Sequence, residues 1–130
     1  MSGELILVVE DNEKNLKLAR ALLRMNGYRT LEANTAEHAI ELASAHLPRL
    51  ILLDVQLPGM DGLAALARLK AEPRTSSIPV VALTAFAMKE DRERFARAGF
   101  DGYLAKPIDV DAFPEQVRRY CEGEEGAEHG

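Results

Sequence analysis

The chain has 130 residues, of which 47% are hydrophobic and 28% charged, a length and balance that suit one globular domain with its own apolar core. No apolar segment is long enough to cross a membrane, and no basic region followed by a signal-type apolar segment occurs at the N-terminus, so we expect a cytoplasmic protein without membrane association. The single cysteine, Cys121, excludes an internal disulfide.

Most of the net charge of −5 comes from the end of the chain. Residues 122–130 hold four Glu and neither Lys nor Arg, so we expect a domain at residues 1–121 and an acidic, disordered tail at 122–130. The remaining body is nearly neutral, and the basic residues of segment 89–97 alternate with acidic ones, as on a solvated helix face. This distribution argues against nucleic-acid binding.

Strand and helix patterns alternate along the body. Short apolar runs rich in Val, Ile and Leu predict strands buried on both faces of a parallel sheet, and two shorter or more polar runs indicate edge strands. In chain order these five runs cover residues 5–9, 28–33, 50–53, 80–83 and 103–105. The helices that follow them carry apolar faces at Leu16–Leu23, Ala36–Ala43, Leu63–Leu69, about 89–98, and Phe113–Tyr120.

Five strand–helix repeats are typical of an α/β fold with helices on both faces of a parallel sheet. Right-handed crossovers leave few topologies, and we expect the flavodoxin-like strand order 2-1-3-4-5. In that order the ligand crevice lies beyond the carboxyl ends of the strands, at the switch between strands 1 and 3.

Side chains that can bind a metal or take part in a reaction follow four of the five predicted strands. They are Glu10 and Asp11 after the first, Asp54 after the third, Thr84 after the fourth and Lys106 after the fifth. Clustered carboxylates repel one another unless a cation is present, and an oxygen-only ligand set favours Mg²⁺. A carboxylate can act as a nucleophile that forms an acyl phosphate, while a metal and a lysine offset charge on the transferring group.

In these motifs the chain resembles the response-regulator receiver domains of two-component signalling, over residues 4–121. The motifs are Glu10-Asp11, the segment 53–62 (Leu-Asp-Val-Gln-Leu-Pro-Gly-Met-Asp-Gly), Thr84-Ala85 and Lys106-Pro107. Segment 80–89 is similar to the single-domain regulators of bacterial cell division, and also to the receiver modules attached to hybrid kinases. Whether the chain acts alone or as such a module stays open.

The resemblance implies a role for each residue of the constellation. Asp54 would be the phosphoacceptor, and Lys106 would contact a phosphoryl oxygen towards which Thr84 moves. The Mg²⁺ ligands would be Asp11, Asp54 and the backbone carbonyl of Gln56, with Glu10, where most relatives carry Asp, helping directly or through water. Tyr103 would be the switch aromatic whose ring turns inward, and the Lys106-Pro107 bond would be cis.

The same resemblance implies the partners. A histidine kinase or a histidine phosphotransfer protein would donate the phosphoryl group, and a target protein would read the face made by helix 89–98, strand 103–105 and the last helix. We expect no DNA-binding output domain and no enzymatic activity beyond the chain's own phosphorylation and dephosphorylation.

Three other classes fit the residues less well. A phosphatase of the haloacid-dehalogenase type needs a second acid two residues after the nucleophile, where this chain has Gln56. A flavin binder needs a phosphate-cradling loop after the first strand, where this chain has Glu10-Asp11-Asn12-Glu13. A Walker-type nucleotidase needs a Gly-x-x-x-x-Gly-Lys-Ser/Thr motif, which the sequence lacks.

Two local features complete the expectations. Pro114 stands inside the last helix, where it costs least in the first turn, so we predict a late helix start with Asp111, rather than Asp109, as the N-cap. The turn at residues 58–62 contains glycines at which we expect positive φ.

Overall fold

The structure, a computed structural model, describes residues 3–57, 61–85 and 88–122. The expected tail from residue 123 onwards and the turn residues 58–60 lie outside the described residues. Within them, the five strands are β1 (Leu5–Val9), β2 (Arg29–Ala33), β3 (Leu50–Asp54), β4 (Val80–Thr84) and β5 (Gly102–Ala105). The five helices are α1 (Glu13–Met25), α2 (Ala36–His46), α3 (Gly62–Ala71), α4 (Lys89–Ala98) and α5 (Phe113–Cys121).

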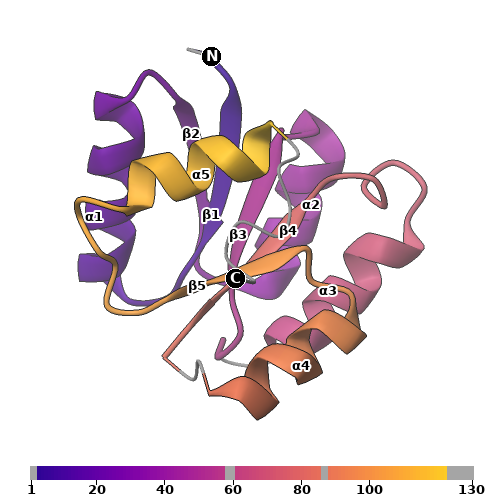
Figure 1. The fold of residues 1–130 in the computed structure, drawn as a ribbon. Coiled ribbons are helices and arrows are strands. Elements are labelled where there is room, and N and C mark those ends of the chain that lie inside the picture. The colour runs from indigo at the N-terminus through magenta and orange to yellow at the C-terminus, as the bar shows by residue number, and fades with distance from the viewer. Residues whose placement is uncertain (1–2, 58–60, 86–87, 123–130) are drawn as a thin grey trace.

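The strands form one parallel sheet in the order β2-β1-β3-β4-β5, as the sequence predicts. Figure 1 shows α1 and α5 on one side of this sheet and α2, α3 and α4 on the other. Every residue of β3 and β4 is buried, because these strands lie between neighbours in the sheet and between helices on its faces. The two strands with more exposed residues, β2 and β5, are the edges.

Side-chain alternation along the strands divides the core into two layers. In β1, Leu7 and Val9 pack with α2, α3 and α4, whereas Ile6 and Val8 pack with α1 and α5. The buried residues of α2 are all alanines, whereas α5 buries Phe113 and other larger side chains. Both layers are needed because each face of a sheet buried on both sides is apolar.

Helix starts and stops follow their local signals. The side chains of Asn12, Thr35 and Asp61 accept hydrogen bonds from backbone N–H groups in the first turns of α1, α2 and α3. Gly99 ends α4 at a φ of 113°, a left-handed conformation that suits glycine. No helix within the described ranges is long and apolar enough to span a bilayer.

The expectation for Gly62 is wrong, because its φ is not in the left-handed region. Its requirement is close approach: a Cβ placed there would lie 2.5 Å from the Cα of Val55 and 2.7 Å from the carbonyl oxygen of Asp54. Glycine at this position therefore lets the start of α3 pack directly on the backbone that follows β3.

The late start of α5 is confirmed, since the helix begins at Phe113 and Pro114 lies in its first turn. The predicted cap is wrong. Ala112 is the N-cap residue, and the carboxylate of Asp109 accepts the N–H groups of Asp111 and Ala112 at 3.0 and 3.2 Å. Asp109 thus closes a separate turn ahead of the helix, and the proline costs α5 no interior hydrogen bond.

Candidate functional site

The predicted site residues converge at the carboxyl edge of the sheet, where parallel strands end together. One carboxylate oxygen each from Glu10, Asp11 and Asp54 lie within 4.8 Å of one another. Glu10 and Asp54 are buried, and Asp11 is exposed at the mouth of the cluster. The central strands β1 and β3 bring these residues together although they are far apart in the sequence.

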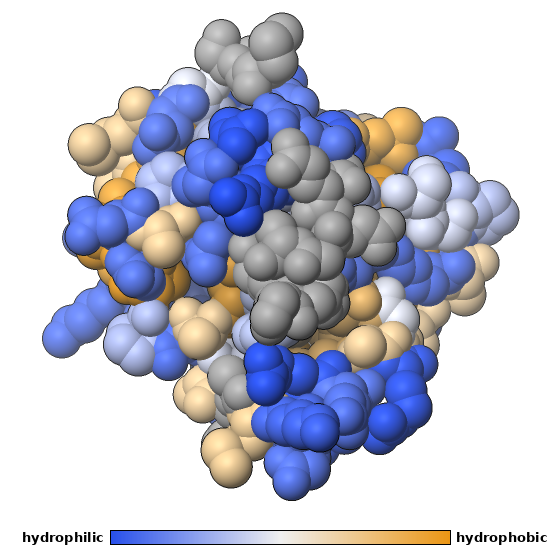
Figure 2. Space-filling model, in the orientation of Figure 1, coloured by the Kyte–Doolittle hydropathy of each residue, from blue (hydrophilic) through white to orange (hydrophobic). Residues whose placement is uncertain are grey.

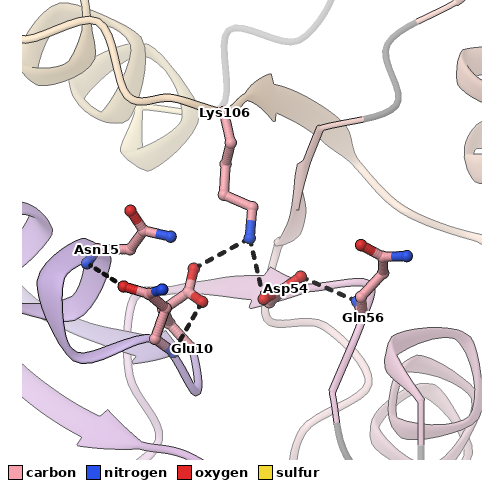
Figure 3. A network of polar contacts seen from close by, with 6 residues as sticks. Glu10, Asn15, Asp54, Gln56 and Lys106 are labelled. Carbon is pink, nitrogen blue, oxygen red and sulfur yellow. Dashed lines mark hydrogen bonds and ion pairs between the residues drawn. The ribbon is translucent and has the colours of Figure 1, made fainter.

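Lys106 binds two of the three carboxylates (Figure 3). Its Nζ donates to Oδ2 of Asp54 at 3.0 Å and to Oε1 of Glu10 at 3.3 Å. The exposed fractions of the two carboxylate side chains are only 3% and 2%, so these ion pairs are screened much less than surface pairs. The lysine follows β5, and its peptide bond to Pro107 is cis, as the resemblance implies.

Backbone N–H groups satisfy the remaining carboxylate oxygens. The N–H of Gln56 donates to Oδ1 of Asp54 at 2.9 Å, and the N–H of Asn12 donates to Oε2 of Glu10 at 3.1 Å. Figure 3 shows the Asp54 carboxylate between the Gln56 N–H and Lys106. Each buried carboxylate therefore has a fixed orientation, with one oxygen towards Lys106.

The pKa values of the site reflect the competition between burial and charge. Burial raises the pKa of Glu10, and the neighbouring Asp54 raises it further, against the lowering effects of the Asn12 N–H and Lys106. Burial by itself lowers the pKa of Lys106, but the hydrogen bond and charge of Asp54, together with Glu10, more than offset it and leave the pKa raised. The lysine is therefore charged at neutral pH.

The cluster carries an excess of carboxylates over cations, since three acidic side chains face the single ammonium group of Lys106 among the described residues. A hard divalent cation with oxygen ligands would balance this excess, and the donor set is one that Mg²⁺ accepts. The residues present therefore fit the metal that the sequence predicts.

Thr84 and Gln56 lie where the sequence places them, at the ends of β4 and β3. Thr84 is fully buried, and its carbonyl oxygen accepts the N–H of Lys106 at 2.8 Å. This hydrogen bond joins the end of β4, which carries Thr84, to the end of β5, which Lys106 follows. The side chain of Gln56 is exposed beside Asp54. The roles assigned to them, and the ligand role of the Gln56 carbonyl, stay predictions.

Tyr103 is half-buried and lies on the side of the sheet that α4 covers. Arg92 of α4 donates from Nη1 to the Tyr103 hydroxyl at 3.0 Å, and its Cζ lies 5.6 Å from the ring centroid. Reading Arg92 as part of a solvated face is therefore wrong. The spacing of charged residues in segment 89–97 does not predict this contact, because Tyr103 lies on β5, further along the chain.

Comparisons with known proteins agree with this geometry. The family model described as "Response regulator receiver domain" matches residues 6–118. The polar-differentiation response regulator DivK of Brucella ovis is 44% identical over 115 residues, which cover 88% of this chain and 94% of that protein.

Two solved structures illustrate the likeness in fold. The receiver domain of the sensor histidine kinase PA1611 from Pseudomonas aeruginosa PAO1, whose structure has a magnesium ion coordinated in the active-site cleft, is 35% identical, with a TM-score of 0.85 over 93% of this chain and 99% of that one. The chemotaxis protein CheY4 of Vibrio cholerae shares the fold with a TM-score of 0.85 at 21% identity, over 91% of this chain and 98% of that one.

Proposed function

Since the chain belongs to the response regulator receiver domain family, we propose that it accepts a phosphoryl group on Asp54 in a Mg²⁺-dependent reaction and signals through a change on the face formed by α4, β5 and α5. The observation that carries the proposal is the Lys106 ammonium 3.0 Å from the Asp54 carboxylate, at the buried end of β3 and within a cluster of acidic oxygens. That arrangement provides a nucleophile together with the charge that transfer requires.

In the proposed step, a carboxylate oxygen of Asp54 forms a bond to phosphorus while the P–N bond of a phosphohistidine breaks. The imidazole leaves with the electron pair, and the product is an acyl phosphate on Asp54. The Gln56 N–H and Lys106 hold the carboxylate in one orientation, so little reorganisation is needed before attack. The hydroxyl of Thr84 is the candidate donor to a phosphoryl oxygen.

Glu10, Asp11, Asp54 and the carbonyl of Gln56 are the residues that would hold Mg²⁺. When bound, the metal would supply positive charge that offsets both the carboxylates and the phosphoryl oxygens. The magnesium ion in the active-site cleft of the Pseudomonas aeruginosa receiver domain supports a magnesium site in this chain.

The proposed phosphodonor is a histidine kinase or a histidine phosphotransfer protein, and the proposed reader is a target protein on the α4–β5–α5 face. Turnover of an external substrate is not part of the proposal, because Gln56 occupies the position at which a phosphatase of this kind needs an acid. A cytoplasmic location likewise remains a prediction.

Intact-mass spectrometry tests the proposed chemistry. The protein is incubated with acetyl phosphate, with Mg²⁺ or with EDTA, and compared with the Asp54→Asn and Asp61→Asn variants. We expect one added phosphoryl group in the wild type and in Asp61→Asn, whose carboxylate caps α3, and none in Asp54→Asn or with EDTA. An adduct of equal yield in Asp54→Asn would overturn the assignment.

A further inference from the structure

Helix α4 is held to the sheet by few apolar contacts. Phe95 is the one buried residue of this helix, all of whose residues the structure describes. The surface over α4 is largely hydrophilic, as the blue area at the lower right of Figure 2 shows. Because most helical stability in proteins comes from a packed apolar face, a helix with one buried side chain depends strongly on any other contact it makes.

One such contact among the described residues is between Arg92 and Tyr103. Arg92 lies three residues before Phe95 and so shares its side of the helix. Its guanidinium combines a hydrogen bond to the Tyr103 hydroxyl with a position over the ring, and its Nε is shielded from solvent with no hydrogen-bond partner in the part of the chain that the structure describes. Such shielding strengthens the attraction between a cation and an aromatic ring.

Tyr103 is also a neighbour of Thr84. The β4–β5 register pairs Ala82 with Tyr103 and Thr84 with Ala105. Side chains alternate along a strand, and Ala82 lies in the core layer under α4, so Thr84 shares that face and is one pleat away from Tyr103. The residue paired with Tyr103 across the two strands is the small Ala82.

From these contacts we propose that Arg92 restrains Tyr103 in the unphosphorylated protein, and that loss of the Arg92–Tyr103 contact is the step by which a change at Thr84 reaches α4. The proposal rests on the proposed function, in which the Thr84 hydroxyl donates to a phosphoryl oxygen. A ring turned towards Thr84 withdraws its hydroxyl from α4 and cannot keep the hydrogen bond to Arg92. The N-terminal half of α4 then loses its link to β5 and becomes free to adopt another position, a shift between two populations of one fold.

The test observes the Tyr103 ring and the helix α4 separately, in protein labelled with 3-fluorotyrosine. The chain has three tyrosines, and Tyr103→Phe identifies the resonance of Tyr103 by its disappearance. Arg92→Ala, Arg92→Lys and the matched control Arg97→Ala, which removes an exposed arginine from the same helix, are compared with the wild type. Fluorine spectra report the environment of the ring, and hydrogen exchange reports the opening of α4.

In unphosphorylated protein, we expect Arg92→Ala to move the Tyr103 resonance in the direction in which phosphorylation moves it in the wild type. Exchange of the α4 amides should rise about three- to tenfold, and phosphorylation by acetyl phosphate should accelerate by a similar factor, as expected for loss of one hydrogen bond and one cation–π contact. Arg92→Lys should give smaller changes, and Arg97→Ala none.

A Tyr103 resonance and α4 exchange rates that stay at their wild-type values in Arg92→Ala would overturn the proposal, even if the variant is phosphorylated normally. If instead the wild type accepts no phosphoryl group, the proposed function fails. The spectra and exchange rates of the unmodified variants then still decide whether Arg92 restrains Tyr103.

Discussion

Glu10 is a buried carboxylate of the site, and the structure shows what its side chain does. It spans the distance from β1 to Lys106 while its other oxygen accepts the N–H of Asn12. Burial raises its pKa and the neighbouring Asp54 raises it further, so folding favours the protonated form more than the unfolded chain does. In the absence of metal, Glu10 therefore opposes the stability of the fold at neutral pH.

Glu10→Gln should consequently stabilise the metal-free protein at neutral pH. The folded-state pKa of Glu10 is above its ordinary value of 4.5, so the wild type loses stability as the pH rises from about that value through the folded-state pKa, whereas the glutamine variant has no such loss. We expect similar melting temperatures near pH 4 and a higher one for the variant at pH 7, measured in EDTA. Glu13→Gln, an exposed position in α1, is the control, and a variant less stable than the wild type at pH 7 would contradict the account.

At the scale of the elements, the sequence predicts the fold closely and the contacts between elements poorly. Each strand lies within one residue of its expected position and each helix contains its expected apolar face, because apolar periodicity and capping residues are local signals. The convergence of Glu10, Asp54 and Lys106 was also predictable, since it follows from parallel strands that end at one edge. The contact between Arg92 and Tyr103 and the close approach at Gly62 depend on tertiary geometry, which periodicity does not encode. The turn that Asp109 closes is local, but Asp109 and Asp111 are both carboxylates ahead of α5, and the sequence does not distinguish them.

The start of α5 provides a paired test of capping. Asp109→Ala removes the acceptor for two backbone N–H groups and should destabilise the protein by about 1 kcal/mol. Asp111→Ala, two residues on, removes an exposed carboxylate that accepts neither of them and should change stability by less than about 0.5 kcal/mol. Urea unfolding monitored by circular dichroism measures both, and a larger effect at Asp111 would show that the helix is capped as the sequence predicted.

Gly62→Ala tests the contact between α3 and the end of β3. The added methyl group would meet backbone atoms of Asp54 and Val55, which cannot move aside as a flexible side chain could, so we expect a loss of about 1–3 kcal/mol in the free energy of unfolding. Ala64→Ser, on the exposed face of the same helix, controls for substitution in α3. Equal stabilities of the Gly62→Ala variant and the wild type would mean that the approach is looser than the structure shows.

For the molecule as a whole, the dense core makes stability sensitive to high pH. Burial, followed by the charge of Glu4, raises the pKa of the Cys121 thiol from 9.0 to about 11, and burial raises that of Tyr28 from 10.0 to about 12. Both groups ionise earlier in the unfolded chain than in the folded one. Unfolding therefore releases protons in this range, and stability falls as the pH rises.

The melting temperature of the wild type should accordingly decline between pH 9 and 11. The melting temperature of the Cys121→Ala variant should decline less steeply over the same range, although the truncated side chain makes this variant less stable at pH 7. Differential scanning calorimetry in EDTA at several pH values compares the slopes. Parallel slopes for the two proteins would show that the thiol does not contribute.

The central claim is that Asp54, and not a neighbouring carboxylate, receives the phosphoryl group. Borohydride tests it most directly, because hydride reduces an acyl phosphate to a primary alcohol with release of phosphate and leaves free carboxylates unchanged. After phosphorylation with acetyl phosphate and Mg²⁺, borohydride treatment and peptide sequencing, the account predicts homoserine at position 54 and intact side chains at Glu10 and Asp11. Reduction at Glu10 or Asp11 instead, with position 54 still aspartate, would contradict it.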